Sequence, residues 1–221
     1  MTDQRLAEIC NALTRAYHNP RHGNKKNPLD ELVYIILSTR TQETAYQSAY
    51  ANLKRAFRSW SDITPSDLPR VRTILQPIGL AALKAGQIER IVSQLRRDFG
   101  GATLAPLKRW TVAQAEEYLV SLPGVGRKVA KCVLMYSLRK HVLPVDVHVH
   151  RVARRLGFQV KRRPDTSQQM LEDAVQPRWR YGFHVNAIAH GRAVCRPNHP
   201  RCSICCLKDW CEYYFSQPTR P

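Results

Sequence analysis

The sequence predicts an all-α protein, and three observations support this prediction. Apolar residues recur every three or four positions along most of the chain, which is the spacing of one helix face. Cap-forming residues stand where such stretches begin, as Thr111 does with Gln114 three positions later. The alternation typical of strands is confined to the Val/His segment 145–150, which is too short to indicate a strand. We find no internal repeat and no low-complexity segment.

The first predicted helix covers residues 4–18, where apolar side chains share one face. A basic linker with Gly and Pro follows at 18–28 and forms the first candidate domain boundary. A strongly apolar helix is expected at 30–39. Three further helices are expected at 43–58, 66–75 and 82–98.

Two helical patterns then flank the segment Leu122-Pro123-Gly124-Val125-Gly126. The glycines allow the backbone to turn tightly there, so we predict a helix–hairpin–helix unit. Its first helix begins at Thr111, and its second is expected to continue to Arg139-Lys140, positive residues typical of a last turn. The free N–H groups at the start of the second helix can bind a phosphate oxygen.

Lys128 lies in the first turn of this second helix. Its neighbours Arg127 and Lys131, together with the helix dipole, disfavour a protonated amine, so Lys128 can act as a nucleophile. The alternative is a surface lysine that contacts phosphate. Asp146 follows Pro144 and precedes another helical pattern, so we expect it to cap that helix as an ionised carboxylate. A plain N-cap without a catalytic role is the alternative.

The remaining helical segments are expected to start after Asp146 and to recur near the C-terminus. A basic loop at 161–164 separates the helix after Asp146 from two segments at 167–175 and 181–193.

Charge and apolar content restrict the class of protein. The 35 Lys and Arg residues outnumber the 17 Asp and Glu residues, which gives a net charge of +18 and favours nucleic acid or an anionic membrane as partner. The 221 residues, 43% hydrophobic, suffice for one large domain or two small ones. No apolar run approaches the roughly 18 residues that span a bilayer, and the start lacks a signal-peptide core. We expect a cytoplasmic, nucleoid-associated protein, although a nuclear one stays open.

Seven cysteines occur, and five of them lie near the C-terminus. An odd number with two isolated in helical patterns, Cys10 and Cys132, argues for a metal site rather than disulfides and makes those two core residues. Four thiolates can surround one metal centre, either tetrahedral zinc or a [4Fe–4S] cluster, and spacing alone does not choose between these. The four candidates follow a C-x6-C-x2-C-x5-C pattern: Cys195, Cys202, Cys205 and Cys211.

The segments LPGVGRK and Val145-Asp146-x-His148 resemble the endonuclease III branch of the helix–hairpin–helix superfamily of DNA glycosylases. This resemblance, which covers nearly the whole chain, implies base excision repair by a glycosylase that is also an abasic-site lyase. Lys128 would attack the sugar C1′ with Asp146 assisting, and the Schiff base would undergo β-elimination. The implied partner is double-stranded DNA with damaged bases or abasic sites, bound by a monomer.

The resemblance also implies an architecture and a cofactor. A six-helix barrel would cover residues 29–140, and residues 1–28 would join 141–221 in a second domain. The cysteine spacing is similar to that of the family's cluster loop, which favours a [4Fe–4S] cluster on Cys195, Cys202, Cys205 and Cys211.

In this family two loops open the base stack, and they correspond to Arg40-Thr41-Gln42 and Ile78-Gly79-Leu80. Leu80 would be the apolar wedge; the alternative is an ordinary buried leucine in a turn. The other residues expected to contact DNA are Leu122, Gly124, Val125, Gly126, Arg127 and His148.

Three positions depart from the family pattern. Arg40 replaces a glutamine that fills the vacated stack, Val120 replaces a glutamate lining the base pocket, and Val147 replaces a threonine. Oxidised pyrimidines are therefore only the family's default substrate. A monofunctional thymine or uracil mismatch glycosylase and a non-catalytic DNA-binding protein stay as alternatives, whereas Ile35 and Lys128 argue against the adenine-specific relatives.

Overall fold

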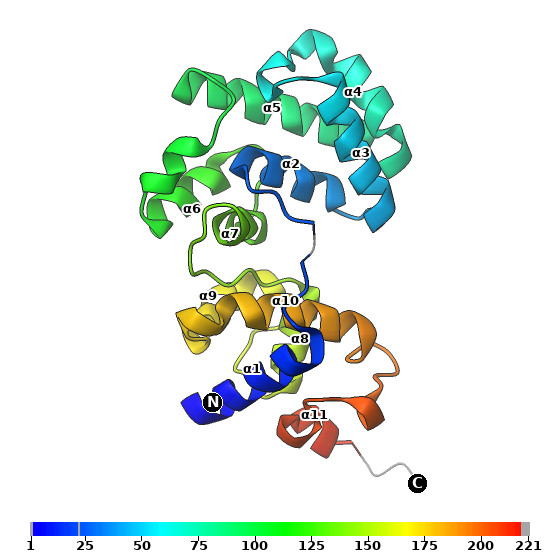
Figure 1. The fold of residues 1–221 in the computed structure, drawn as a ribbon, viewed down its shortest axis with the longest axis vertical. Helices are drawn as coiled ribbons and strands as arrows, with labels where there is room; N and C mark the ends of the chain where they lie inside the picture. Colours follow the sequence, from blue (N-terminus) through cyan, green and yellow to red (C-terminus); the bar gives the residue numbers. More distant parts are fainter. Residues whose placement is uncertain (1, 22, 218–221) are drawn as a thin grey trace. The chain divides into compact units, whose positions relative to one another are not determined.

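A computed structural model describes residues 2–21 and 23–217 (Figure 1). Across these residues the chain forms helices and turns and no strand, which confirms the predicted all-α class. Two compact units divide the chain. One covers Asn24–Lys140, and the other combines the residues up to Gly23 with those from His141 onward. No helix in the described ranges is long and apolar enough to cross a membrane.

The unit 24–140 contains six α-helices packed around a central apolar one. This central helix, α2, is buried at every position from Pro28 to Leu37 except Asp30, which is only partly so. It contacts α3, α5 and α7, while α4 packs on α5 and α6 packs on α7. The continuous apolar run of α2 is therefore explained by neighbours on several sides. The six helices are α2 (Pro28–Ser38), α3 (Glu43–Ala56), α4 (Leu68–Leu75), α5 (Ala81–Phe99), α6 (Val112–Ser121) and α7 (Arg127–Tyr136).

The start of α2 differs from the predicted position 30. The Asn27 side chain accepts hydrogen bonds from the N–H groups of Leu29 and Asp30 at 2.9 and 3.2 Å, and Pro28 occupies the first helical position. A proline tolerates this position because its missing N–H would have no partner inside the helix. The basic linker thus ends at Asn27.

The hairpin helices begin as predicted, but the second one ends early. Thr111 and Gln114 form the expected capping box at the start of α6. The prediction that the second helix continues to Arg139-Lys140 is wrong, because α7 ends at Tyr136 and Arg139 has a left-handed backbone, with φ 57°. The Lys140 ammonium donates instead to the carbonyl of Trp110 at 2.9 Å. The residues after Tyr136 thus form a loop that packs against the protein, in place of the expected last turn of α7.

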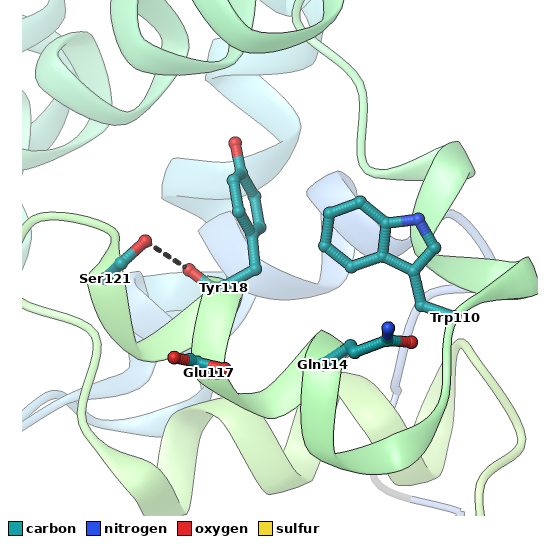
Figure 2. Close-up of a pocket in the computed structure, with 5 residues that line it drawn as sticks. All are labelled: Trp110, Gln114, Glu117, Tyr118 and Ser121. Atoms are coloured by element: carbon teal, nitrogen blue, oxygen red, sulfur yellow. Dashed lines mark hydrogen bonds between the residues drawn. The ribbon is translucent and has the colours of Figure 1, made fainter.

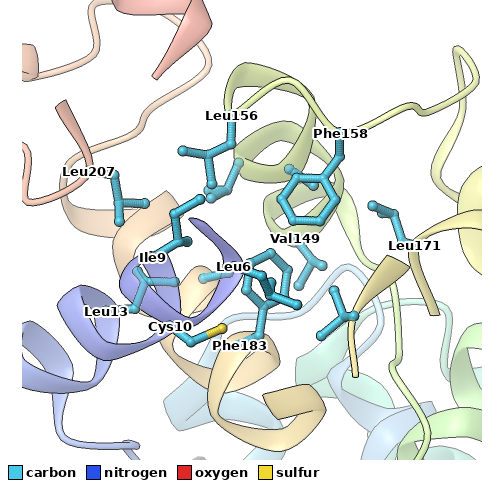
Figure 3. Packing of buried hydrophobic residues seen from close by; sticks show 14 of the residues in the cluster. Leu6, Ile9, Cys10, Leu13, Val149, Leu156, Phe158, Leu171, Phe183 and Leu207 are labelled. Atoms are coloured by element: carbon cyan, nitrogen blue, oxygen red, sulfur yellow. The ribbon is translucent and has the colours of Figure 1, made fainter. Parts of the chain in front are cut away.

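The other unit is built from helices at both ends of the chain. Helix α1 packs on α10, and α10 packs on α8, so residues near the N-terminus share a core with the C-terminal part. Leu6, Ile9 and Leu13 meet Phe183 in this core (Figure 3). Cys10 is buried here and Cys132 in the other unit, as predicted. The helices of this unit are α1 (Asp3–Tyr17), α8 (Val147–Arg155), α9 (Pro164–Ala174), α10 (Pro177–Ala193) and the short α11 (Glu212–Phe215).

Both α9 and α10 begin earlier than the predicted 167 and 181. Each has proline at its first helical position, as α2 does. The apolar periodicity starts only in the second turn of these helices, which is why periodicity alone placed their starts too late.

Candidate functional site

The hairpin between α6 and α7 depends on Gly124. Its backbone is left-handed, with φ 69°, and a Cβ at this position would lie 2.7 Å from Nε2 of Gln87. The same Gln87 amide donates to the carbonyl of Pro123 at 3.0 Å, which fastens the hairpin to α5. Leu122 and Val125 are buried, so only their backbone groups remain to contact DNA. Gly124 is thus required both for the turn and for the close approach of Gln87.

Lys128 is exposed in the first turn of α7. Gly126 precedes the helix and has no side chain with which to cap the first N–H groups, so a phosphate oxygen can bind them. Arg127 beside it is also exposed. Lys131, by contrast, is buried and its ammonium lies 2.9 Å from the Glu116 carboxylate. The positive charge expected from Lys131 is therefore largely offset, and Arg127 and the helix N-terminus remain as the predicted electropositive surroundings.

A buried carboxylate, Glu31 of α2, was missed in the sequence. Its oxygens accept hydrogen bonds from Asn24 at 2.6 Å and from the N–H of Lys25 at 2.5 Å. Burial raises the pKa of Glu31, and the nearby positive charges of Lys25 and Lys128 oppose that rise. A glutamate inside the apolar run of α2 was the signal that could have identified it, because such a residue must face a polar partner.

Arg40 and Leu80 both adopt a left-handed backbone, with φ 54° and 53°. Such values are uncommon outside glycine and cost free energy, so the surrounding structure must maintain them. Arg40 is exposed and Leu80 is 49% exposed, so the alternative of an ordinary buried leucine is wrong. Leu83, one turn further along α5, is 61% exposed and was not predicted. The two loops therefore present two side chains outward in a constrained conformation.

The other predicted residues of this unit differ in how they are exposed. Gln42 is exposed and precedes α3. Val120, at the end of α6, is 39% exposed. Thr41 was expected to contact DNA, and its hydroxyl donates to the carbonyl of Ile78 at 3.1 Å. Thr41 thus connects the two loops to each other.

In the other unit Asp146 caps α8 as predicted. Its Oδ1 accepts hydrogen bonds from the N–H groups of His148 and Val149 at 2.9 and 2.8 Å, which satisfies two donors at the start of the helix. His148 Nδ1 accepts from the guanidinium of Arg151 at 3.0 Å. Burial lowers the pKa of His148, and the positive charges of Arg151 and Arg192 lower it further, against the opposing effect of Asp146.

The C-terminal loop gathers the four predicted cysteines. Cys195 and Cys211 are buried, while Cys202 and Cys205 are partly exposed. Burial raises the pKa of the Cys205 thiol to about 12. The thiols of Cys206, Cys195 and Cys211 contribute to this rise, which places them within electrostatic range of Cys205. Thiols in such surroundings ionise when a bound cation compensates their charge.

Two neighbours of these thiols were missed in the sequence. The buried Arg155 donates to Sγ of Cys195 at 3.2 Å and to the carbonyl of Arg196 at 2.7 Å. Nε2 of the buried His190 lies 3.6 Å from Sγ of Cys205, and its Nδ1 is 2.8 Å from the Tyr17 hydroxyl. Arg155 lies on α8 and His190 on α10, two helices that each carry several other basic residues, so the sequence alone did not single out either one.

Chemically, the loop suits a thiolate-bound metal group. Among the described residues, no three His, Cys, Asp or Glu side chains are arranged to hold a single metal ion. The donor set nevertheless consists of four thiols within seventeen residues, two of them buried. A guanidinium hydrogen bond to sulfur, as Arg155 supplies, is the kind of outer contact that stabilises a ligating thiolate. The donors present therefore fit a four-thiolate group.

A hollow of about 470 Å³ lies on one side of α6. Its walls are Trp110, Gln114, Glu117, Tyr118 and Ser121 (Figure 2). The Tyr118 hydroxyl donates to Asp98 at 2.6 Å, and Ser121 donates to the carbonyl of Tyr118 at 2.7 Å. These residues are distinct from the predicted site residues, so the hollow gives no support for a base pocket at Val120.

Comparison with known proteins identifies the family. Residues 33–177 match the model of the HhH-GPD superfamily of base excision DNA repair proteins. Endonuclease III of Thermotoga maritima is 30% identical over 209 residues, which cover 95% of this chain and 93% of that protein. A solved trapped endonuclease III–DNA covalent intermediate is similar with a TM-score of 0.80 and 23% identity, covering 97% of this chain and 98% of that one. A thermostable thymine-DNA glycosylase is similar with a TM-score of 0.82 and 19% identity, covering 97% and 99%.

The chain therefore belongs to the HhH-GPD superfamily of base excision DNA repair proteins and, within it, is an endonuclease III-like enzyme. It is a DNA glycosylase with abasic-site lyase activity, and its partner is damaged DNA. The predicted family, fold class and type of enzyme are confirmed. The two structural neighbours are less than 25% identical and share the fold alone.

Proposed function

We propose that Lys128 is the nucleophile both for removal of the damaged base and for cleavage of the strand at the abasic site. The observation that carries this proposal is an exposed primary amine in the first turn of α7, beside N–H groups that can hold a DNA phosphate. The neutral amine attacks C1′ of the damaged nucleotide, and the C1′–N bond to the base breaks as the base leaves with a proton. The resulting amine adduct opens to a Schiff base.

The Schiff base then makes strand cleavage possible. It acidifies the C2′ proton, whose removal expels the 3′-phosphate by β-elimination, and water later releases Lys128 from the sugar. One of the solved structures compared above is a trapped endonuclease III–DNA covalent intermediate, which supports this chemistry.

Asp146 is proposed to assist as a carboxylate. The N–H groups of His148 and Val149 both donate to Oδ1 of Asp146, so Oδ2 is not required to cap α8. An ionised carboxylate stabilises the positive charge that develops at C1′ when the base leaves. Its role is electrostatic, and it complements the covalent role of Lys128.

The proposed substrate is an oxidised pyrimidine in double-stranded DNA, bound by one copy of the chain. Arg40 and Leu80 are proposed to enter the stack, while Gln42, Arg127, His148 and the hairpin backbone contact DNA. Exposed positions at Arg40 and Leu80 support the first assignment. A thymine mismatch is the second candidate, because the thymine-DNA glycosylase compared above shares the fold and Val120 provides no carboxylate to bind base N–H groups.

The cofactor is proposed to be a [4Fe–4S] cluster on Cys195, Cys202, Cys205 and Cys211. The thiol donor set and the Arg155 contact support it, as does the full-length likeness to endonuclease III. When bound, such a cluster ties the C-terminal loop together through four Fe–S bonds. The two units would then be a barrel domain and a cluster domain, divided near residues 28 and 140. Iron and acid-labile sulfide analysis should give about four of each per chain.

Replacing Lys128 tests the function. Lys128→Ala should abolish cleavage of a duplex with one abasic site while DNA affinity stays within about tenfold, because one phosphate contact at most is lost. Arg127→Ala is the matched control: it removes the adjacent positive charge and should weaken binding but retain cleavage at saturating protein. Undiminished cleavage by Lys128→Ala would show that another group is the nucleophile.

A further inference from the structure

Lys84 is a buried lysine that the proposed chemistry does not use. It lies in the first turn of α5 and is only 3% exposed. Its ammonium donates to the carbonyl of Leu37 at 2.9 Å and to the Thr41 hydroxyl at 2.7 Å. Leu37 belongs to the last turn of α2, and Thr41 belongs to the loop that follows it. One side chain thus connects α5 to the end of α2 and to the loop bearing Arg40.

The contact continues from Thr41 to the second loop. The Thr41 hydroxyl oxygen accepts a hydrogen bond from the Lys84 ammonium. The hydroxyl can therefore donate its own hydrogen to the carbonyl of Ile78, which lies 3.1 Å away. The carbonyl of Thr39 lies at the same distance and can share this hydrogen. A chain of hydrogen bonds therefore links the loop before α3 with the loop before α5.

The same two loops carry the left-handed residues. Arg40 directly precedes Thr41, and Leu80 follows Ile78 by two positions. The N–H of Lys84 also bonds the carbonyl of Leu80 at 2.9 Å, so Lys84 touches the Leu80 loop through its backbone and the Arg40 loop through its side chain. Lys84 therefore stabilises the backbone conformations of both loops, which present the Arg40 and Leu80 side chains outward.

Stability alone does not explain a lysine at this place. Its two side-chain partners are uncharged, and a buried ammonium with neutral partners pays a large desolvation cost. Burial accordingly lowers the pKa of Lys84. The ammonium does provide a positive charge at the C-terminal end of α2, whose own last turn has none. A methionine would fill a similar volume without the desolvation cost of an ammonium. The reason for a lysine here is therefore the hydrogen bonds that it makes to Leu37 and Thr41.

We propose that Lys84 is a positioning residue that holds the Arg40 and Leu80 loops in the geometry needed to open the base stack. This inference rests on the proposed roles of Arg40 and Leu80 as the stack-entering side chains. It predicts a defect confined to DNA in which a stack must be opened, because Lys84 acts through the loops and leaves the attack by Lys128 intact.

The test compares two abasic substrates, one in a duplex and one in a single strand, under single-turnover conditions. Lys84→Met should reduce cleavage of the duplex by about tenfold or more, since small displacements of positioning groups have effects of that size. Cleavage of the single strand should change by less than about twofold, because it has no stack to open. The fluorescence of 2-aminopurine placed opposite the abasic site should rise on binding of the wild type and rise less with the variant.

Two further variants make the comparison decisive. Lys140→Met is the matched control, since the Lys140 ammonium also donates to backbone carbonyls of this unit, those of Trp110 and Lys108. It should leave the ratio of duplex to single-strand cleavage unchanged. Thr41→Val removes the hydroxyl but retains the lysine and should lower that ratio as Lys84→Met does, which provides a second test if Lys84→Met does not fold.

An unchanged ratio in both Lys84→Met and Thr41→Val, or an equal loss on both substrates, would overturn the inference. Failure of the proposed function would look different, because the wild type itself would then cleave neither substrate.

Discussion

At the scale of single residues, charged side chains behave differently according to their partners on other helices. Lys128 is exposed as its place in the helix predicts, whereas Lys131, three positions on, is buried against Glu116 of α6. Glu31 is buried in α2 and lies within electrostatic range of Lys128. Exposure at a helix start follows from local pattern, but these pairings depend on which helices meet, and the sequence does not show that.

The raised pKa of Glu31 predicts how stability depends on pH. The folded protein holds the Glu31 proton to a higher pH than the unfolded chain does. In the unfolded chain, glutamates have a pKa of about 4.3. The contribution of Glu31 is therefore fully present below the unfolded pKa and is lost as pH rises through the folded pKa. Glu31→Gln should flatten the decline of the free energy of unfolding above about pH 4.3, measured by urea denaturation at several pH values.

The exposed Glu117→Gln provides the control for this measurement, since it removes an equal charge from the surface of the same unit. Its pH dependence should match the wild type. If Glu31→Gln also matched the wild type, burial would not govern the titration of Glu31.

At the scale of elements, the hairpin is where sequence and structure agree most closely. A Gly-punctuated turn between two helical patterns, the first of them capped by Thr111, predicted the unit, and Gly124 indeed has a backbone that other residues rarely adopt. The close approach of Gln87 from α5 could not be predicted, because it joins segments far apart in the chain.

Gly124→Ala should therefore destabilise the protein and weaken DNA binding. The added Cβ meets both an unfavourable φ and the Gln87 amide, a combination expected to cost about 1–3 kcal/mol of unfolding free energy. Thermal denaturation measures the stability loss, and a duplex-binding titration measures the affinity. Gly101→Ala is the control, because a Cβ there meets no atom within 4 Å. Equal stability of the two variants would contradict the account of the hairpin.

Helix ends show why periodicity predicts existence better than boundaries. Every α-helix predicted from the sequence is present in the described residues, yet α2, α9 and α10 start earlier because proline occupies their first positions. Helix α7 ends earlier because the following loop packs against the protein. The short α11 was missed since four residues carry too little periodicity.

At the scale of the whole molecule, the chain forms one unit from its middle and another from its two ends. The packing of α1 on α10 has no local signal in the sequence, because it joins residues more than 160 positions apart. The resemblance to a known family supplied that expectation. The spacing of the cysteines predicted the candidate metal ligands. The contacts of Arg155 and His190 with Cys195 and Cys205 could not be predicted, because they depend on the packing of the C-terminal loop against α8 and α10.

Lys128 belongs to one unit and Asp146 to the other. The full chain is therefore the proper material for testing the mechanism, and a covalent adduct is its most specific product. The Schiff base that Lys128 forms can be reduced by borohydride to a stable amine that links protein and DNA.

The most direct test is borohydride trapping on two duplexes, one with an abasic site and one with a single oxidised pyrimidine. We expect an adduct of the wild type with both duplexes and none with Lys128→Ala. An adduct with the abasic site alone would retain Lys128 and move the specificity to another lesion, with Val120 and Arg40 as the first positions to exchange. An adduct that persists in Lys128→Ala, or the absence of any adduct of the wild type with both duplexes, would show that Lys128 is not the nucleophile.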